Sequence, residues 1–175
     1  YDGSLRIGAM VTHRTLEKSD LIRKEFSALA DAVDALGSIQ IRNVATIAGN
    51  ICTAAPSADT ATPLLVLGAQ VKIKSLKEEK TVSIEEFFMG PGETILERGE
   101  IVTELIIPKP LPNTGSAYLK HQRRLALDLP ILGVSTLLTL DKSTVSCSDM
   151  LCTTSPISSV LHTMEQDELA CRDVK

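Results

Sequence analysis

The chain has 175 residues, 43% of them hydrophobic, and a formal net charge of −4, so it carries enough apolar side chains for a packed core. The acidic balance argues against a nucleic-acid partner, and no apolar run reaches the length of a membrane span. The four cysteines lack paired C-x-x-C spacing, which argues against a metal or iron–sulfur site built from them. Inert thiols and the absence of a secretory signal pattern predict a cytoplasmic location.

In chain order, residues 5–13 alternate apolar and polar side chains, as a half-buried strand does. Residues 19–35 carry apolar side chains at helical spacing, and Gly37 is a suitable helix end. We expect residues 41–65 to run as strand, turn and helix, with the helix beginning at Ser57 or Ala58. Further on, the pattern predicts strands over 70–76 and 81–84, a short helical turn over 84–88 and a strand over 101–107.

The second half of the chain begins with a Pro-rich stretch, P-K-P-L-P-N-T-G, over residues 108–115. Such a stretch ends the preceding strand and is the best candidate for a linker between two domains. After it, the pattern predicts an antiparallel sheet, followed by a helix from Ser158 onward. The expected strands cover residues 116–122, 131–140 and 144–153.

The segment over residues 41–65 is the most informative part of the chain. It sets small hydrogen-bonding residues among apolar ones, with Arg42 and Asp59 as its only charges. Small side chains allow another molecule to approach the backbone, and Gly49 permits backbone angles that other residues avoid. Hydroxyl, amide and N–H groups in such a place can hold an anion or a sugar.

The same segment resembles the second flavin-contacting motif of the FAD-binding subunit in molybdenum hydroxylases, the family of xanthine dehydrogenase and aerobic carbon monoxide dehydrogenase. Ala48 stands where the family usually has a glycine, and Ala55 stands where serine is common. Similarity to the family extends on both sides, over roughly residues 5–141. The matching motif residues are Ile41, Arg42, Asn43, Thr46, Ile47, Gly49, Asn50, Pro56, Ala58 and Asp59.

The resemblance implies an α+β fold in two parts. Residues 1–110 would form the middle α/β subdomain of a vanillyl-alcohol-oxidase/PCMH-type FAD-binding domain. Residues 114–175 would form part of a CO-dehydrogenase-flavoprotein-type C-terminal domain. The family has a further glycine-rich loop that holds the FAD pyrophosphate, and this chain shows no such loop. We therefore expect the chain to be a fragment of a longer polypeptide, a proteolysed product or one part of a split subunit, and to bind FAD weakly or not at all by itself.

The resemblance also assigns roles within the motif. Thr46, Gly49 and Asn50 would face the pyrophosphate through a hydroxyl, a backbone N–H and an amide. Thr53 would hydrogen-bond the phosphate or ribityl region, and Asp59 would accept from ribityl or ribose hydroxyls. The full implied set of cofactor-binding residues is Thr46, Ile47, Gly49, Asn50, Thr53, Asp59, Val102 and Lys120.

Outside the motif, each implied role has a plainer alternative. Val102 would border the adenine or isoalloxazine ring, or serve only as strand core. Lys120 would lie near the flavin ring or its ribityl chain, or on a solvated strand edge. Asp128 would shape the flavin pocket or be a turn carboxylate. We expect Arg42 to bond carbonyl groups at the motif turn rather than a phosphate. No catalytic or metal-ligating set of side chains is visible in the sequence.

The function implied by the resemblance is that of an FAD-binding electron-transfer subunit of a molybdenum hydroxylase. A molybdopterin-binding large subunit would hydroxylate the substrate. Electrons would pass through 2Fe–2S clusters on a small subunit to FAD, and then to an acceptor such as NAD, a quinone or oxygen. The alternative is a non-catalytic assembly or interaction module that keeps the fold and binds no flavin. A flavin-dependent reductase of a related type would need its own acid or base, and none is visible.

Overall fold

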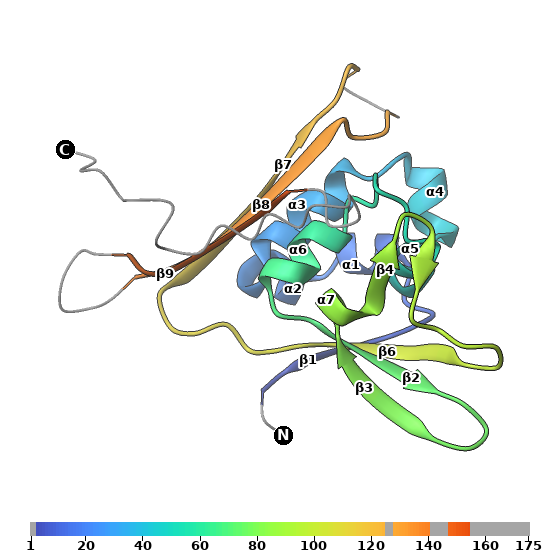
Figure 1. Cartoon of the computed structure of the whole chain (residues 1–175). Helices are drawn as coiled ribbons and strands as arrows, with labels where there is room; N and C mark the ends of the chain where they lie inside the picture. Colours follow the sequence, from blue (N-terminus) through green and yellow to red (C-terminus); the bar gives the residue numbers. More distant parts are fainter. Residues whose placement is uncertain (1–2, 125–127, 141–146, 155–175) are drawn as a thin grey trace, which may run out of the picture.

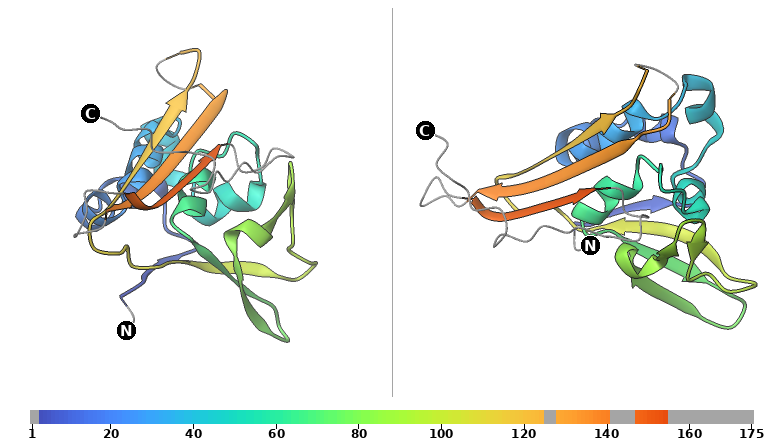
Figure 2. Two further views of the ribbon diagram at one scale, coloured as in Figure 1. Left: turned by 60° about the vertical axis from the view of Figure 1, so that its left-hand side comes forward. Right: turned by 45° about the horizontal axis from the view of Figure 1, so that its top comes forward.

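The computed structural model describes residues 3–124, 128–140 and 147–154, and shows a mixed helical and sheet fold that confirms the predicted α+β class. A group of short helices lies between two separate antiparallel sheets (Figures 1 and 2). The helices are α1 (His13–Glu17), α2 (Asp20–Glu25), α3 (Ser27–Ala35), α4 (Ile39–Val44), α5 (Ile47–Thr53), α6 (Ala61–Val66) and α7 (Ile84–Phe87).

The first sheet has the strand order β1-β6-β2-β3, and every neighbouring pair is antiparallel. Its central strand β6 pairs Val102 with Ile73 and Leu105 with Val71, which places a row of buried side chains on one face. The strands of this sheet are β1 (Leu5–Gly8), β2 (Gln70–Lys74), β3 (Glu79–Ser83) and β6 (Ile101–Ile107). A small hairpin of β4 (Phe88–Gly90) and β5 (Glu93–Thr94) lies between β3 and β6 in the chain.

The second sheet consists of β7 (Thr114–His121), β8 (Leu132–Leu140) and β9 (Cys147–Thr154) in sequence order. Its strand β7 packs on α3, and β8 packs on α6. Ser116 fixes the first of these contacts, because its Oγ accepts from the Ala28 backbone N–H at 3.1 Å and its carbonyl accepts from the Ser27 hydroxyl. The second sheet therefore rests directly on the helices of the first part of the chain.

Side-chain caps explain why so many short helices form. The hydroxyls of Thr12, Ser19, Ser38 and Ser83 each accept a hydrogen bond from the backbone N–H three residues later. Such a cap satisfies one of the unpaired N–H groups at a helix start and typically contributes about 1 kcal/mol. Helices of four to nine residues are marginal by themselves, so packing into the common core must supply the rest.

The core lies between the helices and the inner face of the first sheet. Each fully buried Ile, Leu or Phe side chain contributes roughly 1.5–3 kcal/mol relative to exposure. The largest completely buried apolar side chains of this core are Phe87, Ile22, Leu29, Ile47, Ile51, Leu64, Ile73, Ile84, Leu105 and Ile107.

Several predicted elements agree with the structure. The strand over 101–107 has the predicted bounds, and the helical turn at 84–88 is α7. The strands over 70–76 and 81–84 correspond to β2 and β3. The predicted helix from Ser158 onward lies outside the described residues.

The predicted strand at the start of the 41–65 segment is wrong. Residues there form α4 and α5, and only Thr46 makes an isolated bridge, to Thr12. The reason is local, because the Ser38 hydroxyl caps α4 at Ile41, and the apolar side chains of that run point outward. Ile41 is 47% exposed and Val44 is 77% exposed, so the run does not form a buried strand.

Two other boundaries also differ from the prediction. The strand expected over 5–13 ends at Gly8, because Thr12 already caps α1. The helix expected from Ser57 or Ala58 begins at Ala61, after a turn in which the Ala58 N–H donates to the Ala55 carbonyl. Among the described residues, no helix is long and apolar enough to cross a membrane.

Candidate functional site

The centre of the motif is helix α5 and its first turn. Thr46 is the N-cap, and its Oγ1 accepts from the Gly49 backbone N–H at 3.1 Å. A Cβ at position 49 would lie only 3.0 Å from that oxygen, so glycine allows the close cap. Thr46, Gly49, Asn50 and Thr53 are spaced three or four apart, which places them on one side of the helix. Gly49 and Thr53 are exposed, and Thr46 and Asn50 are half-buried, so this side of α5 is open to a ligand.

The hydrogen bonds already present decide what each of these groups can still do. The Asn50 Oδ1 accepts from the buried Thr60 hydroxyl at 2.7 Å, which leaves the Asn50 amide nitrogen as a donor without a partner in the described part of the chain. The Thr46 hydroxyl accepts from Gly49, and its own proton has no acceptor among residues 3–124. Two donors therefore remain on the exposed side of α5, and a phosphate oxygen accepts from such donors.

Thr53 differs from these two residues. Its hydroxyl already donates to the Gly49 carbonyl at 2.8 Å. In that state it can only accept, so it suits a ligand hydroxyl and not a phosphate oxygen. Of the two roles that the sequence left open for Thr53, this geometry favours the ribityl region.

Asp59 lies in a second, buried group at the end of the motif. Its Oδ1 accepts from the Tyr118 hydroxyl at 2.8 Å, and its Oδ2 accepts from Lys120 Nζ at 3.1 Å. The same ammonium donates to the Ala35 carbonyl at 3.1 Å. The Lys120 side chain is only 4% exposed and that of Asp59 is 7% exposed. Lys120 is therefore not a residue of a solvated strand edge, which was the alternative considered for it.

The surroundings shift the acidities in this group. Burial raises the pKa of Asp59 above its ordinary value, while the Tyr118 hydroxyl and the Lys120 ammonium oppose that rise. Burial and the adjacent carboxylate raise the pKa of Tyr118, so its hydroxyl stays protonated and donates at neutral pH. The cluster thus presents one carboxyl group held by one neutral and one cationic donor.

The other predicted site residues lie elsewhere. Ile47 is fully buried, its backbone N–H donates to Val11, and its side chain belongs to the core. Val102 on β6 is also a core side chain. Asp128 accepts from the backbone N–H groups of Arg124 and Leu129, as a turn carboxylate does. Flavin contact by these three residues stays a prediction.

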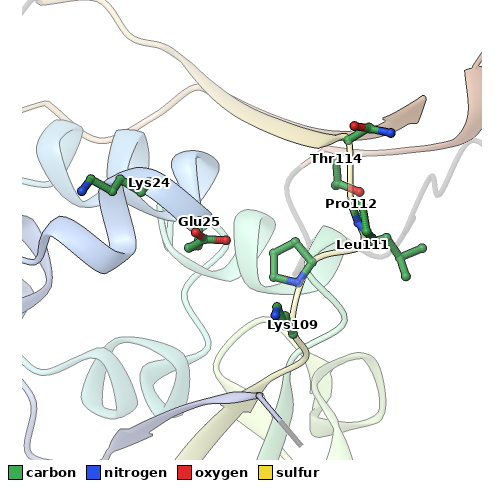
Figure 3. Close-up of a pocket in the computed structure, with 8 residues that line it drawn as sticks. Lys24, Glu25, Lys109, Leu111, Pro112 and Thr114 are labelled. Atoms are coloured by element: carbon green, nitrogen blue, oxygen red, sulfur yellow. The ribbon is translucent and has the colours of Figure 1, made fainter. Parts of the chain in front are cut away.

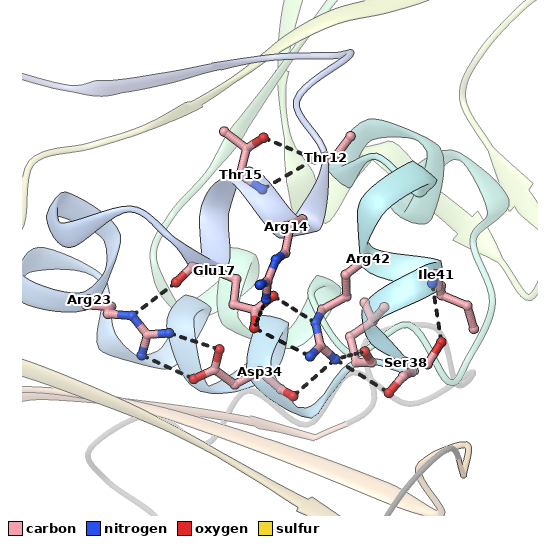
Figure 4. A network of polar contacts seen from close by, with 11 residues as sticks. Thr12, Arg14, Thr15, Glu17, Arg23, Asp34, Ser38, Ile41 and Arg42 are labelled. Carbon is pink, nitrogen blue, oxygen red and sulfur yellow. Dashed lines mark hydrogen bonds and ion pairs between the residues drawn. The ribbon is translucent and has the colours of Figure 1, made fainter.

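Arg42 bonds carbonyl groups as predicted, but these carbonyls lie at the end of α3, before the motif, and not at the motif turn. Its Nη1 donates to the carbonyls of Leu36 at 2.7 Å, and of Asp34 and Gly37 at 3.5 Å (Figure 4). Its Nε donates to Glu17 Oε2 at 3.0 Å. These bonds tie α4 to α1 and to the end of α3, and so fix the position from which the motif segment begins.

Sequence reasoning missed Thr60 and Tyr118. A signal for Tyr118 was present, because it stands two residues before Lys120 and a strand places such residues on the same face. Thr60 follows Asp59 directly, but nothing in the sequence shows that its hydroxyl bonds Asn50.

A groove of about 490 Å³ lies away from the motif, where the end of α2 faces the linker before β7 (Figure 3). None of the eight predicted site residues lines it. Its lining residues are Lys24, Glu25, Lys109, Pro110, Leu111, Pro112, Asn113 and Thr114.

Comparison with known proteins agrees with the motif and the fold. The family model described as FAD binding domain in molybdopterin dehydrogenase matches residues 1–110. A xanthine dehydrogenase FAD-binding subunit of Escherichia coli O157:H7 is 39% identical over 146 residues, which are 83% of this chain and 50% of that protein. The nicotinate dehydrogenase FAD-subunit of Eubacterium barkeri is 33% identical over 75% of this chain and 46% of its own length.

Among solved structures, carbon monoxide dehydrogenase from Hydrogenophaga pseudoflava, in a form that lacks the Mo-pyranopterin moiety of the molybdenum cofactor, matches with a TM-score of 0.82 and 26% identity. The match covers 89% of this chain and 53% of that chain. The chain belongs to the family of FAD-binding domains of molybdopterin dehydrogenases. It spans about half the length of the curated relatives it matches.

Proposed function

We propose that this chain supplies the second flavin-contacting segment of the FAD-binding subunit of a molybdenum hydroxylase. The observation that carries the proposal is the exposed side of α5. There the Thr46 hydroxyl and the Asn50 amide nitrogen have no acceptor among the described residues. Two donors on one helix face match the oxygens of a pyrophosphate, and Thr53 is left to accept from a ligand hydroxyl.

In this proposal the bound FAD supplies the redox chemistry, and the protein binds and orients it. Thr46 and Asn50 hold the phosphates, while Thr60 keeps the Asn50 amide turned with its nitrogen outward. Asp59 accepts from a ribityl or ribose hydroxyl with the lone pairs that Tyr118 and Lys120 leave unused.

The wider assembly is part of the same proposal. Names of relatives such as xanthine dehydrogenase FAD-binding subunit and carbon monoxide dehydrogenase medium chain support a place in a multi-subunit oxidoreductase. The expected partners are a molybdopterin-binding large subunit and a 2Fe–2S small subunit. The expected electron acceptor is NAD, a quinone or oxygen. The cytoplasmic location and the domain boundary between residues 110 and 114 also belong to the proposal.

An NMR titration of the ¹⁵N-labelled chain tests the site, since chemical shifts detect even weak binding. Addition of FAD is expected to move the amide signals of Gly49, Asn50 and Thr53. The hairpin tip at residues 75–78 is expected to stay unchanged. ADP, which shares the pyrophosphate, is expected to move the first two signals as well.

The matched variants are Asn50→Ala and Asn43→Ala. Asn50→Ala removes the proposed phosphate donor and is expected to weaken FAD binding by about 1–3 kcal/mol. Asn43 is an exposed amide in the same segment, and its loss is expected to leave binding unchanged. If FAD moves no signal in α5, the flavin proposal fails, and the non-catalytic interaction module becomes the better description.

A further inference from the structure

Tyr118 is the member of the Asp59 cluster to which the family resemblance assigns no role. Its hydroxyl donates to one carboxylate oxygen of Asp59, and Lys120 donates to the other. Both donors come from the same face of β7, while Asp59 comes from the turn before α6. The direction of the Asp59 carboxyl plane is therefore set by a strand that lies about 60 residues further along the chain.

The Tyr118 ring is held in place by its neighbours. Its backbone N–H donates to Asp31 Oδ2 at 3.2 Å, which ties the strand to α3. The ring lies over Gly133 of β8, the register partner of Lys120. A Cβ at position 133 would lie 2.7 Å from the Tyr118 hydroxyl oxygen and 3.0 Å from Cε2. Glycine at this position therefore leaves the room in which the Tyr118 hydroxyl reaches Asp59.

The position of the hydroxyl matters because Asp59 is almost enclosed. An ionised carboxylate accepts about four hydrogen bonds, and Tyr118 and Lys120 use two of those sites. The directions of the remaining lone pairs of Asp59 are fixed by the orientation of its carboxyl plane. Without the tyrosine donor, the plane would be held only at Oδ2, and burial would favour the protonated acid more strongly.

We propose that Tyr118 is a positioning residue of the flavin site: its hydroxyl, supported by the space above Gly133, orients the Asp59 carboxylate toward a ligand hydroxyl. This inference rests on the proposed function for its link to FAD. The orientation of Asp59 by Tyr118 can be tested without any ligand.

The first test compares Tyr118→Phe with Ser135→Ala. Ser135 is the register partner of Tyr118, is fully buried, and has a hydroxyl without a partner among the described residues. Both variants delete one buried hydroxyl from the same sheet. The Asp59 carboxyl ¹³C signal is followed against pH in the ligand-free chain. Its titration midpoint is expected to move to higher pH in Tyr118→Phe and to stay unchanged in Ser135→Ala.

The second test adds FAD to the same proteins. Loss of the tyrosine donor is expected to weaken FAD binding about tenfold at pH 7, as is usual for one hydrogen bond to a charged group. The loss is expected to shrink as the pH is raised above the new Asp59 midpoint, whereas a merely structural defect would not follow that titration. Gly133→Ala is expected to weaken binding similarly, and the double variant with Tyr118→Phe to add nothing further.

The outcomes separate the two proposals. An Asp59 midpoint that is the same in Tyr118→Phe and in the unchanged protein overturns the positioning role. A shifted midpoint together with no FAD binding by the unchanged protein leaves the orientation of Asp59 by Tyr118 standing and overturns the flavin site. Equal FAD binding by both proteins at every pH overturns the link between Tyr118 and the cofactor.

Discussion

Two polar clusters of this molecule can be compared, because each pairs a largely buried carboxylate with a cationic side chain. The helix cluster consists of Glu17, Arg42 and the carbonyl of Leu36, and it joins α1, α3 and α4. The strand cluster consists of Asp59, Tyr118 and Lys120, and it joins the turn before α6 to β7. The helix cluster connects elements that are close together in the sequence. The strand cluster connects the first part of the chain to the second sheet, about 60 residues further on.

The clusters differ in how firmly their carboxylates are ionised. Burial alone would raise the pKa of Glu17, but hydrogen bonds and charge from Arg14 and Arg42 outweigh it and hold that pKa below its ordinary value. Among the described residues Asp59 has one cationic partner, Lys120, and burial keeps the pKa of Asp59 above its ordinary value. Arg14 and Arg42 together keep Glu17 ionised in a fixed structural contact. One lysine and one tyrosine leave a carboxyl group that its surroundings can still adjust, which suits a position beside a ligand.

The largest expected effect comes from breaking the helix cluster. Arg42→Met leaves Glu17 with Arg14 alone and leaves the Leu36 carbonyl without its donor, so we expect a loss of about 4 kcal/mol in unfolding free energy. Urea denaturation measures it. The control is Arg23→Met, which breaks an ion pair with Asp34 whose side chains are 49% and 44% exposed. That change is expected to cost under about 1 kcal/mol. Equal losses would mean that burial does not distinguish the two arginines.

Burial of His13 is expected to make the free energy of unfolding depend on pH. This histidine is fully buried, both ring nitrogens lack partners among the described residues, and burial and the charge of Arg42 lower its pKa from 6.5 to about 4. Above pH 6.5 the ring is neutral in both states and contributes nothing. As the pH falls from 6.5 to 4, the unfolded chain takes up the proton first, and stability falls by up to about 3 kcal/mol.

Denaturation at several pH values, with His13→Leu and His121→Gln compared, measures this term. His13→Leu is expected to remove most of the loss between pH 6.5 and 4, and His121→Gln, at an exposed position, to keep it. An unchanged pH dependence in His13→Leu would assign the loss to other groups.

The smallest of these effects is expected in the strand cluster. Lys120→Met removes the cation, but Asp59 can then take up a proton, which limits the cost to about 2 kcal/mol at pH 7. Because the neutral acid needs no cation, the variant is expected to regain stability as the pH falls from 7 to 5. Adding Asp59→Asn is expected to recover part of the loss at pH 7. A loss as large as that of Arg42→Met, and independent of pH, would show that both clusters are equally fixed.

Much of the first sheet was readable from the sequence. The strand over 101–107 is rich in β-branched and other apolar residues and stops at Pro108, so both its composition and its end are local. The same holds for the turn at α7, which Ser83 caps. The strand expected at residues 41 onward failed because the Ile and Val residues there resemble a strand, while Ser38 and Thr46 begin helices on either side of Ala45.

The sequence by itself determined the family, the motif around Gly49 and the carbonyl-bonding role of Arg42, because an ordered pattern of residue types and local caps carries that information. Only the tertiary structure decided that Asp59 pairs with Lys120, that Tyr118 is the third member of that group, and that Thr60 turns the Asn50 amide. The contacts of Asp59 with Tyr118 and Lys120 exist because β7 packs against α3 beside the turn before α6. A pairing of side chains so far apart in the sequence depends on how whole elements pack, and no local pattern encodes it.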